Sequence, residues 1–488
     1  MSLINVSSLT FAHDGSYDNI FENASFMLDT DWRLGFIGRN GHGKTTFLNL
    51  LMGKHKYSGT ISASVKFDYF PVQADDKSVC TIDLMYNQQP DLELWQLQKE
   101  LSLLGVDEDV LYRPFGTLSN GEQTKVLLAA LFIKENNFLL IDEPTNHLDA
   151  QAREAVSTYL STKKGFILVS HDRAFLDRCI DHVLVINKTG ITVQKGNFSS
   201  WQRGKDRQDD FERAENERLQ KDIKKLTNAA RRTAAWSDNV EKTKHSGGKI
   251  DRGYIGHKAA KMMKRSKSID ARRSEAVAEK SGLLKNIETA DSLALRPLKH
   301  HQDPLVEVID LSVFYGNKTV CENISFTVNR NERVALNGKN GCGKSSILKL
   351  ICGENIPHSG TVRFGSELIV SYVSQDTSFL RGDLKEFCTH NKIDETLLKT
   401  ILRKLDFSRT QFEKNLEDFS QGQKKKVLLA QSLCNEAHLY IWDEPLNFID
   451  MFSRIQIERL IAEFRPTMIF VEHDRSFADA AATKFIEL

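Results

Sequence analysis

The stretches that decide the fold are GRNGHGKT at Gly38–Thr45 and its near-copy GKNGCGKS at Gly338–Ser345. Each follows a strand-like run and opens a helical pattern. In such a loop the backbone N–H groups surround phosphate oxygens, the lysine reaches the β- and γ-phosphates, and the last hydroxyl binds Mg²⁺. The sequence therefore predicts two nucleotide-binding loops, formed by Gly38, Asn40, Gly41, Gly43, Lys44, Thr45 and Thr46, and by Gly338, Asn340, Gly341, Gly343, Lys344, Ser345 and Ser346.

The two loops belong to a duplicated domain. Lys44 and Lys344 lie 300 residues apart, and Asp142-Glu143-Pro144 recurs 301 residues later as Asp443-Glu444-Pro445. In each copy short apolar runs alternate with helical patterns, which is typical of parallel strands buried on both faces. The predicted fold class is α/β, with a first domain over 1–200, an insert over 201–299 and a second domain over 300–488.

An aspartate and a glutamate follow an apolar strand-like run in each copy. We expect Asp142 and Asp443 to face Mg²⁺, because each stands at the end of its strand. The neighbouring Glu143 and Glu444 are then placed to polarise an attacking water as general bases, which must lie within hydrogen-bond reach of the proton they accept.

A third pattern stands at one fixed distance before both acidic pairs. LSNGEQ at Leu118–Gln123 and FSQGQ at Phe419–Gln423 each place their serine 23 residues before the aspartate. Alone, such a string indicates a helix that begins with a serine cap. At this spacing it resembles the LSGGQ signature of ABC-type ATPases, which implies two domains that bind and hydrolyse ATP with Mg²⁺.

The resemblance to ABC ATPases assigns further residues by motif. His171 and His473 match the switch histidine and are expected to act in catalysis, while Asp149 and Asp450 match the D-loop. Nucleotide contacts are implied for the signature residues and for an aromatic that stacks on adenine, namely Ser119, Gly121, Glu122, Ser420, Gly422, Gln423 and Tyr315. With the glutamines of the Q-loop, the implied Mg²⁺ ligands are Thr45, Gln73, Asp142, Ser345, Gln375 and Asp443.

The same resemblance implies that the two copies close head to tail over two ATP molecules, each loop facing the signature of the other copy. One chain holds both copies, so an intramolecular dimer of domains in a monomer is sufficient. The copies differ: EPTNHLD becomes EPLNFID, Glu472 replaces a serine before the second switch histidine, and His13 aligns with Tyr315. We expect two competent sites with unequal rates.

Composition excludes several other classes of protein. The 488 residues are 40% hydrophobic and 27% charged, as in ordinary globular proteins. No apolar run approaches the roughly 18 residues of a membrane-spanning helix, and the N-terminal sequence is not typical of a secretory signal. The seven cysteines contain no CxxC pair, which indicates a reduced, cytoplasmic protein without a structural zinc site.

The insert between the copies is basic and helical in pattern. From Lys221 to Arg273 there are sixteen Lys and Arg against five Asp and Glu, a net charge of +11, whereas the rest of the chain carries −10. Apolar residues at helical spacing predict a helix, a loop over Ser237–His257 and a return helix. Basic residues and two aromatics, Lys261, Lys264, Arg265, Lys267, Arg272, Arg273, Trp236 and Tyr254, are candidates for contact with RNA. A flexible linker or a merely solvated charged face remain alternatives.

Two ABC domains joined by a basic helical hairpin, without a membrane domain, resemble the ABC-F family of ribosome-associated ATPases. Within it, the stretches Trp32–Leu48, Arg113–Leu128, Tyr440–Asp450 and Ala259–Lys267 are most similar to the Lsa-type antibiotic-resistance proteins, with a small helical arm at about 81–112. The resemblance implies binding to the exit site of the bacterial 70S ribosome, with 23S rRNA and P-site tRNA as partners. The implied activity is the displacement of lincosamides, pleuromutilins and streptogramin A from the peptidyl-transferase centre.

Two alternatives have the same ATPase motifs. A housekeeping ABC-F translation factor that acts on P-site tRNA has the same domain architecture. The ATPase subunit of a transporter with a separate membrane protein has the same ABC domain, although it seldom has two copies fused through such an insert.

Overall fold

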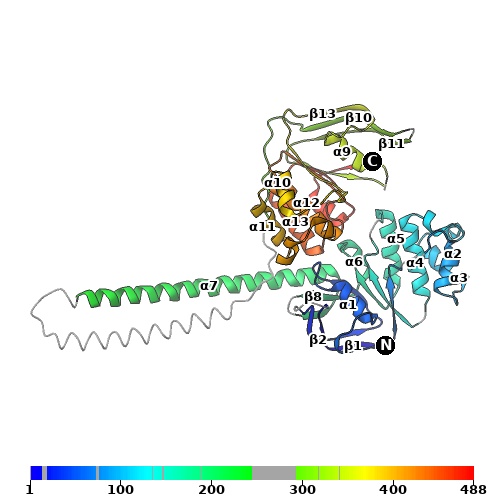
Figure 1. The fold of residues 1–488 in the computed structure, drawn as a ribbon, viewed down its shortest axis with the longest axis horizontal. Coiled ribbons are helices and arrows are strands. Elements are labelled where there is room, and N and C mark those ends of the chain that lie inside the picture. Colours follow the sequence, from blue (N-terminus) through cyan, green and yellow to red (C-terminus); the bar gives the residue numbers. More distant parts are fainter. Residues whose placement is uncertain are drawn as a thin grey trace, which may run out of the picture. The chain divides into compact units, whose positions relative to one another are not determined.

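The computed structural model describes residues 2–13, 19–72, 76–134, 136–145, 148–187, 190–243, 293–316, 318–339 and 341–488. The chain divides into two compact units, the first made of Met1–Trp201 and Ala290–Leu488 and the second of Gln202–Thr289. The first unit contains both copies of the duplicated domain (Figure 1).

A six-stranded sheet carries the phosphate loop of the first copy. Its spatial order is β5 (Lys66–Phe70), β6 (Asn137–Asp142), β7 (Phe166–Val169), β3 (Arg33–Ile37), β8 (His182–Asn187) and β9 (Gly190–Lys195). The pairs are parallel except that β9 runs antiparallel to β8. All four residues of β7 are buried, as in parallel strands covered on both faces.

The second copy repeats this arrangement with five strands. Their order is β14 (Val370–Val373), β15 (Leu439–Asp443), β16 (Met468–Val471), β12 (Arg333–Asn337) and β17 (Lys484–Glu487), and all neighbours are parallel. The predicted α/β class with two tandem copies of one domain is confirmed.

Equivalent helices connect the strands of the two copies (Figure 1). The phosphate loops open α1 (Lys44–Leu51) and α9 (Lys344–Ile351), and the signatures open α4 (Asn120–Ile133) and α12 (Gln421–Cys434). The remaining pairs are α5 (Ala150–Thr162) with α13 (Met451–Phe464), and α6 (Arg173–Cys179) with α14 (Arg475–Ala481).

A smaller helical region precedes each signature. In the first copy it holds α2 (Thr81–Gln88), α3 (Leu94–Leu103) and two short 3-10 turns, Glu108–Tyr112 and Phe115–Thr117. In the second it holds α10 (Leu384–His390), α11 (Glu395–Lys404) and the turns Arg409–Glu413 and Leu416–Asp418. The matching elements show that the duplication extends through this region.

Each copy also has a three-stranded antiparallel sheet, which the sequence analysis did not predict. The orders are β2 (Phe21–Asp29), β1 (Leu3–Phe11) and β4 (Ser58–Ser62), and β11 (Lys318–Val328), β10 (Val306–Tyr315) and β13 (His358–Phe364). The central strands have irregular register, with left-handed backbone at Ser8 and Asp310. These bulges bring β1 and β10 so close to the next strand that only glycine fits opposite them, at Gly59 and Gly360.

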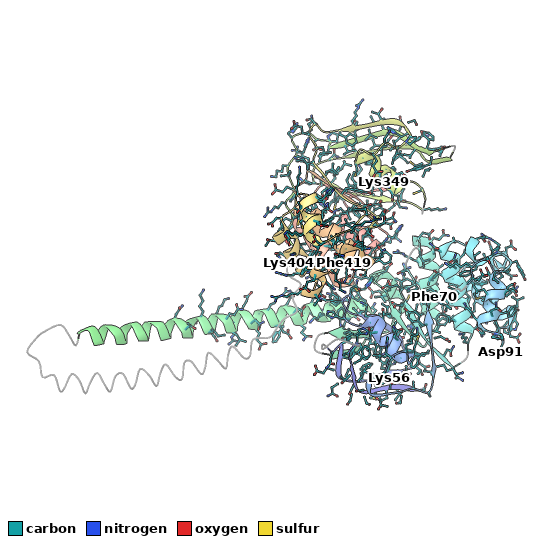
Figure 2. All side chains as sticks on the ribbon, viewed as in Figure 1. Lys56, Phe70, Asp91, Lys349, Lys404 and Phe419 are labelled. Atoms are coloured by element: carbon teal, nitrogen blue, oxygen red, sulfur yellow. The ribbon has the colours of Figure 1, made fainter. Side chains whose placement is uncertain are left out.

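Apolar side chains form two buried clusters in each copy, one on each face of the parallel sheet. Figure 2 shows the side chains of both copies and labels the buried Phe70 and Phe419. The largest fully buried side chain is Trp442 on β15, whose indole N–H donates to Ser432 Oγ at 3.0 Å. Its polar atom is therefore paired inside the core.

Helix α7 (Phe198–Thr243) begins in the first unit and continues as the described part of the second. Phe198 and Trp201 are buried in the first unit, with ring centroids 5.6 Å apart. Further along, ion pairs such as Lys205–Asp209 at 3.0 Å support the exposed helix. The predicted loop at Ser237–His257 begins too early, because α7 remains helical through Thr243; the rest of the loop and the return helix lie outside the described residues.

The close strand contact at Gly360 predicts that Gly360 and Gly353 differ in how well they tolerate alanine. An alanine Cβ at Gly360 would lie 2.4 Å from the carbonyl oxygen of Asp310, whereas at Gly353, also left-handed, it would meet nothing within 4 Å. Gly353→Ala should lower the free energy of unfolding by about 1 kcal/mol from backbone strain alone. Gly360→Ala should cost about 2–4 kcal/mol in urea denaturation. Equal costs would contradict the close strand contact.

Candidate nucleotide sites

The two phosphate loops share two left-handed glycines, Gly41 with Gly341 and Gly43 with Gly343. Gly43 and Gly343, which cap α1 and α9, have φ of 91° and 98°. A Cβ at Gly43 would lie 2.4 Å from Ile20, so glycine is required there for space as well as conformation. The ammonium groups of Lys44 and Lys344 donate to loop carbonyls, at 2.7 Å to Gly38 and 2.9 Å to Gly338. Both lysines therefore lie inside their own loops.

The hydroxyl that ends each loop contacts the aspartate at the end of the neighbouring strand. Thr45 Oγ1 donates to Asp142 Oδ2 at 3.2 Å, and Ser345 Oγ donates to Asp443 Oδ1 at 3.1 Å. The other carboxylate oxygen of Asp443 is buried without a hydrogen-bond partner. Burial raises the pKa of Asp443 to about 6. A hydroxyl beside an unsatisfied carboxylate oxygen is a donor set that suits Mg²⁺, so these residues fit the ion.

Both candidate general bases stand on unusual backbone. Glu143 and Glu444 have φ of 50° and 46°, a left-handed conformation that is costly for residues other than glycine. The strand beside them holds each one in place, because Glu143 N donates to Val169 O at 2.9 Å and Glu444 N donates to Val471 O at 3.0 Å. The shared strain in both copies supports a functional reason for this geometry.

Each glutamate faces the predicted switch histidine. His171 Nε2 lies 3.3 Å from Glu143 Oε1, and His473 Nε2 lies 3.2 Å from Glu444 Oε1. Gln375, predicted as a Mg²⁺ ligand, donates its amide to Glu444 Oε2 at 2.8 Å. The structure thus brings Gln375 and His473 together around the carboxylate of Glu444.

The electrostatic surroundings of the two glutamates differ. Burial, together with the charge of Asp142, raises the pKa of Glu143 to about 8. Burial acts on Glu444 too, but the hydrogen bond from His473 and the charge of Lys425 hold the pKa of Glu444 below its usual value. The two candidate bases are therefore not electrostatically equivalent.

The signature residues begin their helices as caps. Ser119 Oγ accepts from Glu122 N at 3.2 Å while Glu122 Oε2 accepts from Ser119 N at 2.7 Å, and Ser420 and Gln423 form the same reciprocal pair. The side chains of Glu122 and Gln423 are engaged in these caps. Their predicted contact with nucleotide stays a prediction.

The first phosphate loop faces the signature of the second copy. A cavity of about 680 Å³ is lined by Gly41, Gly43, Lys44, Thr45 and Thr46 from one side and by Ser420 and Gly422 from the other. Asn40 Nδ2 donates to Phe448 O at 3.0 Å, and a Cβ at Gly422 would lie 2.4 Å from that same oxygen. Ser420, Gly422 and the Lys44 loop are therefore brought together; His13 lines the same cavity.

The second phosphate loop has a cavity of about 550 Å³ lined by Gly341, Gly343, Lys344, Ser345 and Ser346. Tyr315 also lines it, and its hydroxyl lies 3.1 Å from Ser346 Oγ. From the first signature, Asn120 reaches this cavity, whereas Ser119 and Gly121 are not among its lining residues. Of the other predicted site residues, Gln73 and Asn340 lie outside the described residues.

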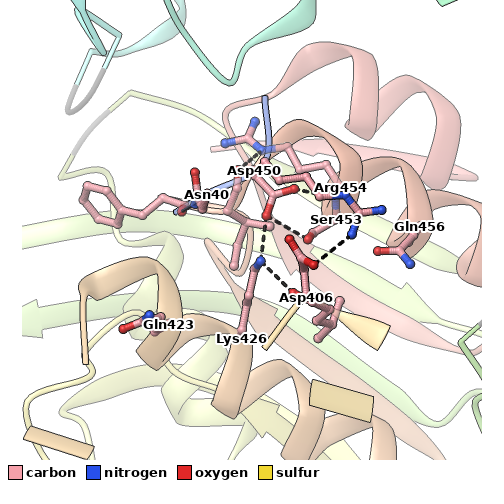
Figure 3. Close-up of polar contacts among 12 residues, drawn as sticks. Asn40, Asp406, Gln423, Lys426, Asp450, Ser453, Arg454 and Gln456 are labelled. Atoms are coloured by element: carbon pink, nitrogen blue, oxygen red, sulfur yellow. Dashed lines mark hydrogen bonds and ion pairs between the residues drawn. The ribbon is translucent and has the colours of Figure 1, made fainter. Parts of the chain in front are cut away.

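The second D-loop aspartate forms a buried ion pair that sequence reasoning missed. Lys426 Nζ on α12 donates to Asp450 Oδ2 at 2.6 Å and to Leu405 O at 2.8 Å, and Asp450 also accepts from Ser453 (Figure 3). This lysine holds the pKa of Asp450 far below its usual range, although burial opposes ionisation. Asp149 instead caps α5 by accepting from Ala152 N and is partly exposed.

Two positions that differ between the copies contact each other within each copy. In the first copy Thr145 Oγ1 and Ser170 Oγ lie 3.3 Å apart. In the second, leucine and glutamate take these positions, and Glu472 Oε1 accepts from the backbone N–H of Leu446 at 2.7 Å. The sequence reveals both differences, but only the structure shows that they meet.

The model of the family described as ABC transporter matches residues 21–146 and 321–447, which is half of the chain. The chain therefore belongs to this family, with two ABC ATPase domains. ABC domains bind ATP, typically with Mg²⁺.

Individual relatives extend across almost the whole chain. The ATP-binding protein Uup of Caulobacter vibrioides is 28% identical, over 96% of this chain and 74% of that protein. The ribosome protection protein VmlR of Bacillus subtilis is 26% identical, over 94% of this chain and 82% of that protein. A solved structure named RNase-L Inhibitor has the same fold, with a TM-score of 0.60 and 19% identity over 99% of this chain and 87% of that one. Among the described residues no helix is long and apolar enough to cross a membrane.

Replacement of Leu446 and Glu472 by the matching residues of the first copy tests the contact between these two positions. Glu472→Ser alone should leave the Leu446 N–H without its acceptor and destabilise the fold by about 1–3 kcal/mol. Leu446→Thr combined with Glu472→Ser restores the hydroxyl pair of the first copy and should recover most of that stability, with the ATPase rate following it. Thermal denaturation and steady-state ATP hydrolysis measure both quantities. A double variant as unstable as the single one would show that the two positions are independent.

Proposed function

We propose that this chain is an ABC-F ATPase that binds the exit site of the bacterial 70S ribosome in its ATP-closed state and protects the ribosome from antibiotics of the peptidyl-transferase centre. The observation that carries this proposal is the long helix α7 between two ABC copies, in a chain that matches a ribosome protection protein over 94% of its length. The drug classes, lincosamides, pleuromutilins and streptogramin A, follow the resemblance to the Lsa-type proteins.

The contacts between glutamate and histidine, and between hydroxyl and aspartate, support the following roles in ATP hydrolysis. Glu143 and Glu444 act as general bases toward the attacking water, and His171 and His473 orient them and contact the γ-phosphate. Thr45 with Asp142, and Ser345 with Asp443, would hold Mg²⁺, which supplies charge neutralisation to the phosphates. The signature residues Ser420 and Gly422 complete the first site from the opposite copy. Ser119 and Gly121 would complete the second site when it closes further. A monomer with an intramolecular dimer of domains is then the working state.

The insert over 201–299 is proposed to contact 23S rRNA and P-site tRNA in the cytoplasm. Its net charge of +11 between Lys221 and Arg273 supports binding to phosphate backbones. Two ordered aromatics at the start of α7, Phe198 and Trp201, anchor this insert in the core of the first unit. We propose that α7, which begins in the first unit and continues into the insert, carries an ATP-dependent change from one to the other.

A housekeeping ABC-F translation factor is the second candidate function, because it has the same domain architecture. Such a factor would act on P-site tRNA whether or not a drug is present. A transporter ATPase, which needs a separate membrane subunit, is the weaker alternative.

Trapping of the closed state tests the assignment of the bases. Glu143→Gln with Glu444→Gln should retain ATP, because the amide keeps the side-chain shape, but should stop hydrolysis and accumulate on ribosomes. Sedimentation with purified ribosomes, with ATP and without it, measures this. A double variant that hydrolyses ATP and leaves the ribosome at the parent rate would contradict both assignments.

Translation in vitro with lincomycin tests the protective function. Purified protein with ATP should restore synthesis, whereas deletion of Ser237–Gly256 should abolish the rescue and leave ATP hydrolysis intact. Replacement of Lys261, Lys264 and Arg265 by Glu should weaken ribosome affinity and flatten its salt dependence. Ribosome binding without rescue would favour the housekeeping factor, and absence of ribosome binding would overturn the ribosomal proposal.

A further inference from the structure

An aspartate of the second copy contacts two side chains of the first phosphate loop. Asp406 Oδ1 lies 3.4 Å from a guanidinium nitrogen of Arg39, and Asp406 Oδ2 lies 3.4 Å from Nε2 of His42. All three side chains are largely buried, with exposed fractions of 23%, 17% and 21%. Both contacts join residues that lie in different copies of the domain.

The charge environment of Asp406 agrees with this arrangement. Burial alone would raise the pKa of Asp406, but the hydrogen bond to His42 and the charge of Arg39 hold it below the usual value. The guanidinium of Arg39 also lies over the ring of Phe452 on α13, 5.7 Å from its centroid. The first loop is therefore held to the second copy by ionic, cation–π and hydrogen-bond contacts, the last from Asn40.

Asp406 has a left-handed backbone conformation that glycine usually adopts. It follows α11 with φ of 70°, and the matching residue after α3 is Gly105 with φ of 62°. The hydrogen bonds around both positions agree, since Phe407 N donates to Leu402 O as Val106 N donates to Leu101 O. Glycine is the usual residue at such a helix end, so the aspartate takes this conformation at a backbone cost.

The other site has none of the three side chains. In the second loop Lys339 and Cys342 stand where the first has Arg39 and His42, and Gly105 has no side chain to face them. Among the described residues, this contact is therefore present at the first ATP site and absent from the second, where Gly105 stands in the place of Asp406.

We propose that Asp406 is a positioning residue of the first ATP site: it holds Arg39 and His42 so that the first phosphate loop stays closed against Ser420 and Gly422. The first site consequently closes more firmly than the second and releases ATP more slowly. Asp406 acts through the loop and touches no reacting atom. This inference rests on the proposed closed ATP sites but not on any role at the ribosome.

Release of a labelled nucleotide from the isolated protein tests the proposal. The full chain with Glu143→Gln and Glu444→Gln is loaded with fluorescent mant-ATP and Mg²⁺, and excess ATP is added. We expect two release phases, with the slow one assigned to the first site by its loss in Lys44→Ala and the fast one to the second by its loss in Lys344→Ala. Asp406→Gly should accelerate the slow phase by about three- to tenfold and leave the fast phase unchanged.

Matched variants separate positioning from a general effect on folding. Glycine suits the backbone at position 406, so Asp406→Gly should keep the parent denaturation midpoint. Arg39→Ala should accelerate the same phase, and the pair Arg39→Ala with Asp406→Gly should do no more than either change alone. The graft Gly105→Asp, Lys339→Arg and Cys342→His should slow the fast phase.

Three results would overturn the proposal. They are a single release phase in the parent, equal acceleration of both phases by Asp406→Gly, and multiplication of the Arg39 and Asp406 effects in the double variant. None of these depends on ribosomes, so failure of translation rescue leaves this test intact, and failure of this test leaves the ribosomal function standing.

Discussion

Each ATP site depends on one backbone reversal at the end of a buried strand. The chain leaves β6 and β15 with an aspartate in regular strand geometry and then turns through a left-handed glutamate. This turn sends the two neighbouring carboxylates in different directions, Asp142 and Asp443 toward the loop hydroxyl and Glu143 and Glu444 toward the histidine. A relaxed extended residue would direct the second carboxylate away from that histidine. The adjacent strand, through one backbone hydrogen bond, keeps the strained form in place.

Much of this arrangement was predictable from spacing because the chemistry of phosphate requires particular residues at particular distances. The glycine-rich loops, the acidic strand ends and the repeated offset defined the α/β class and placed Lys44 beside Thr45 and Asp142. The serine caps were also visible, since S-x-G followed by Glu or Gln is a capping box as well as a signature. The antiparallel sheets were missed, because their strands are irregular in register and mix exposed with buried residues.

Contacts between distant parts of the chain could not be predicted in this way. Nothing in the sequence pairs Asp406 with Arg39, or Lys426 with Asp450, because each contact joins elements whose approach is set by the packing of whole helices. Lysine side chains are mostly exposed in proteins. Lys426 is buried because the carboxylate of Asp450 and the carbonyl of Leu405 satisfy its ammonium group. The exchange of Thr and Ser for Leu446 and Glu472 was visible, but its meaning required the 2.7 Å contact between backbone and carboxylate.

Covalent fusion of the two copies has a consequence for how such sites can change over generations. In a dimer of identical chains, every substitution enters both sites together, so a residue that suits one role must suit the other. Here Glu472 and Gly105 each differ from the matching residue of the other copy, so one site can change while the other site keeps its own residues. A single gene that encodes both halves thus allows substitutions to change the ATPase rate of one site while the other site keeps its rate.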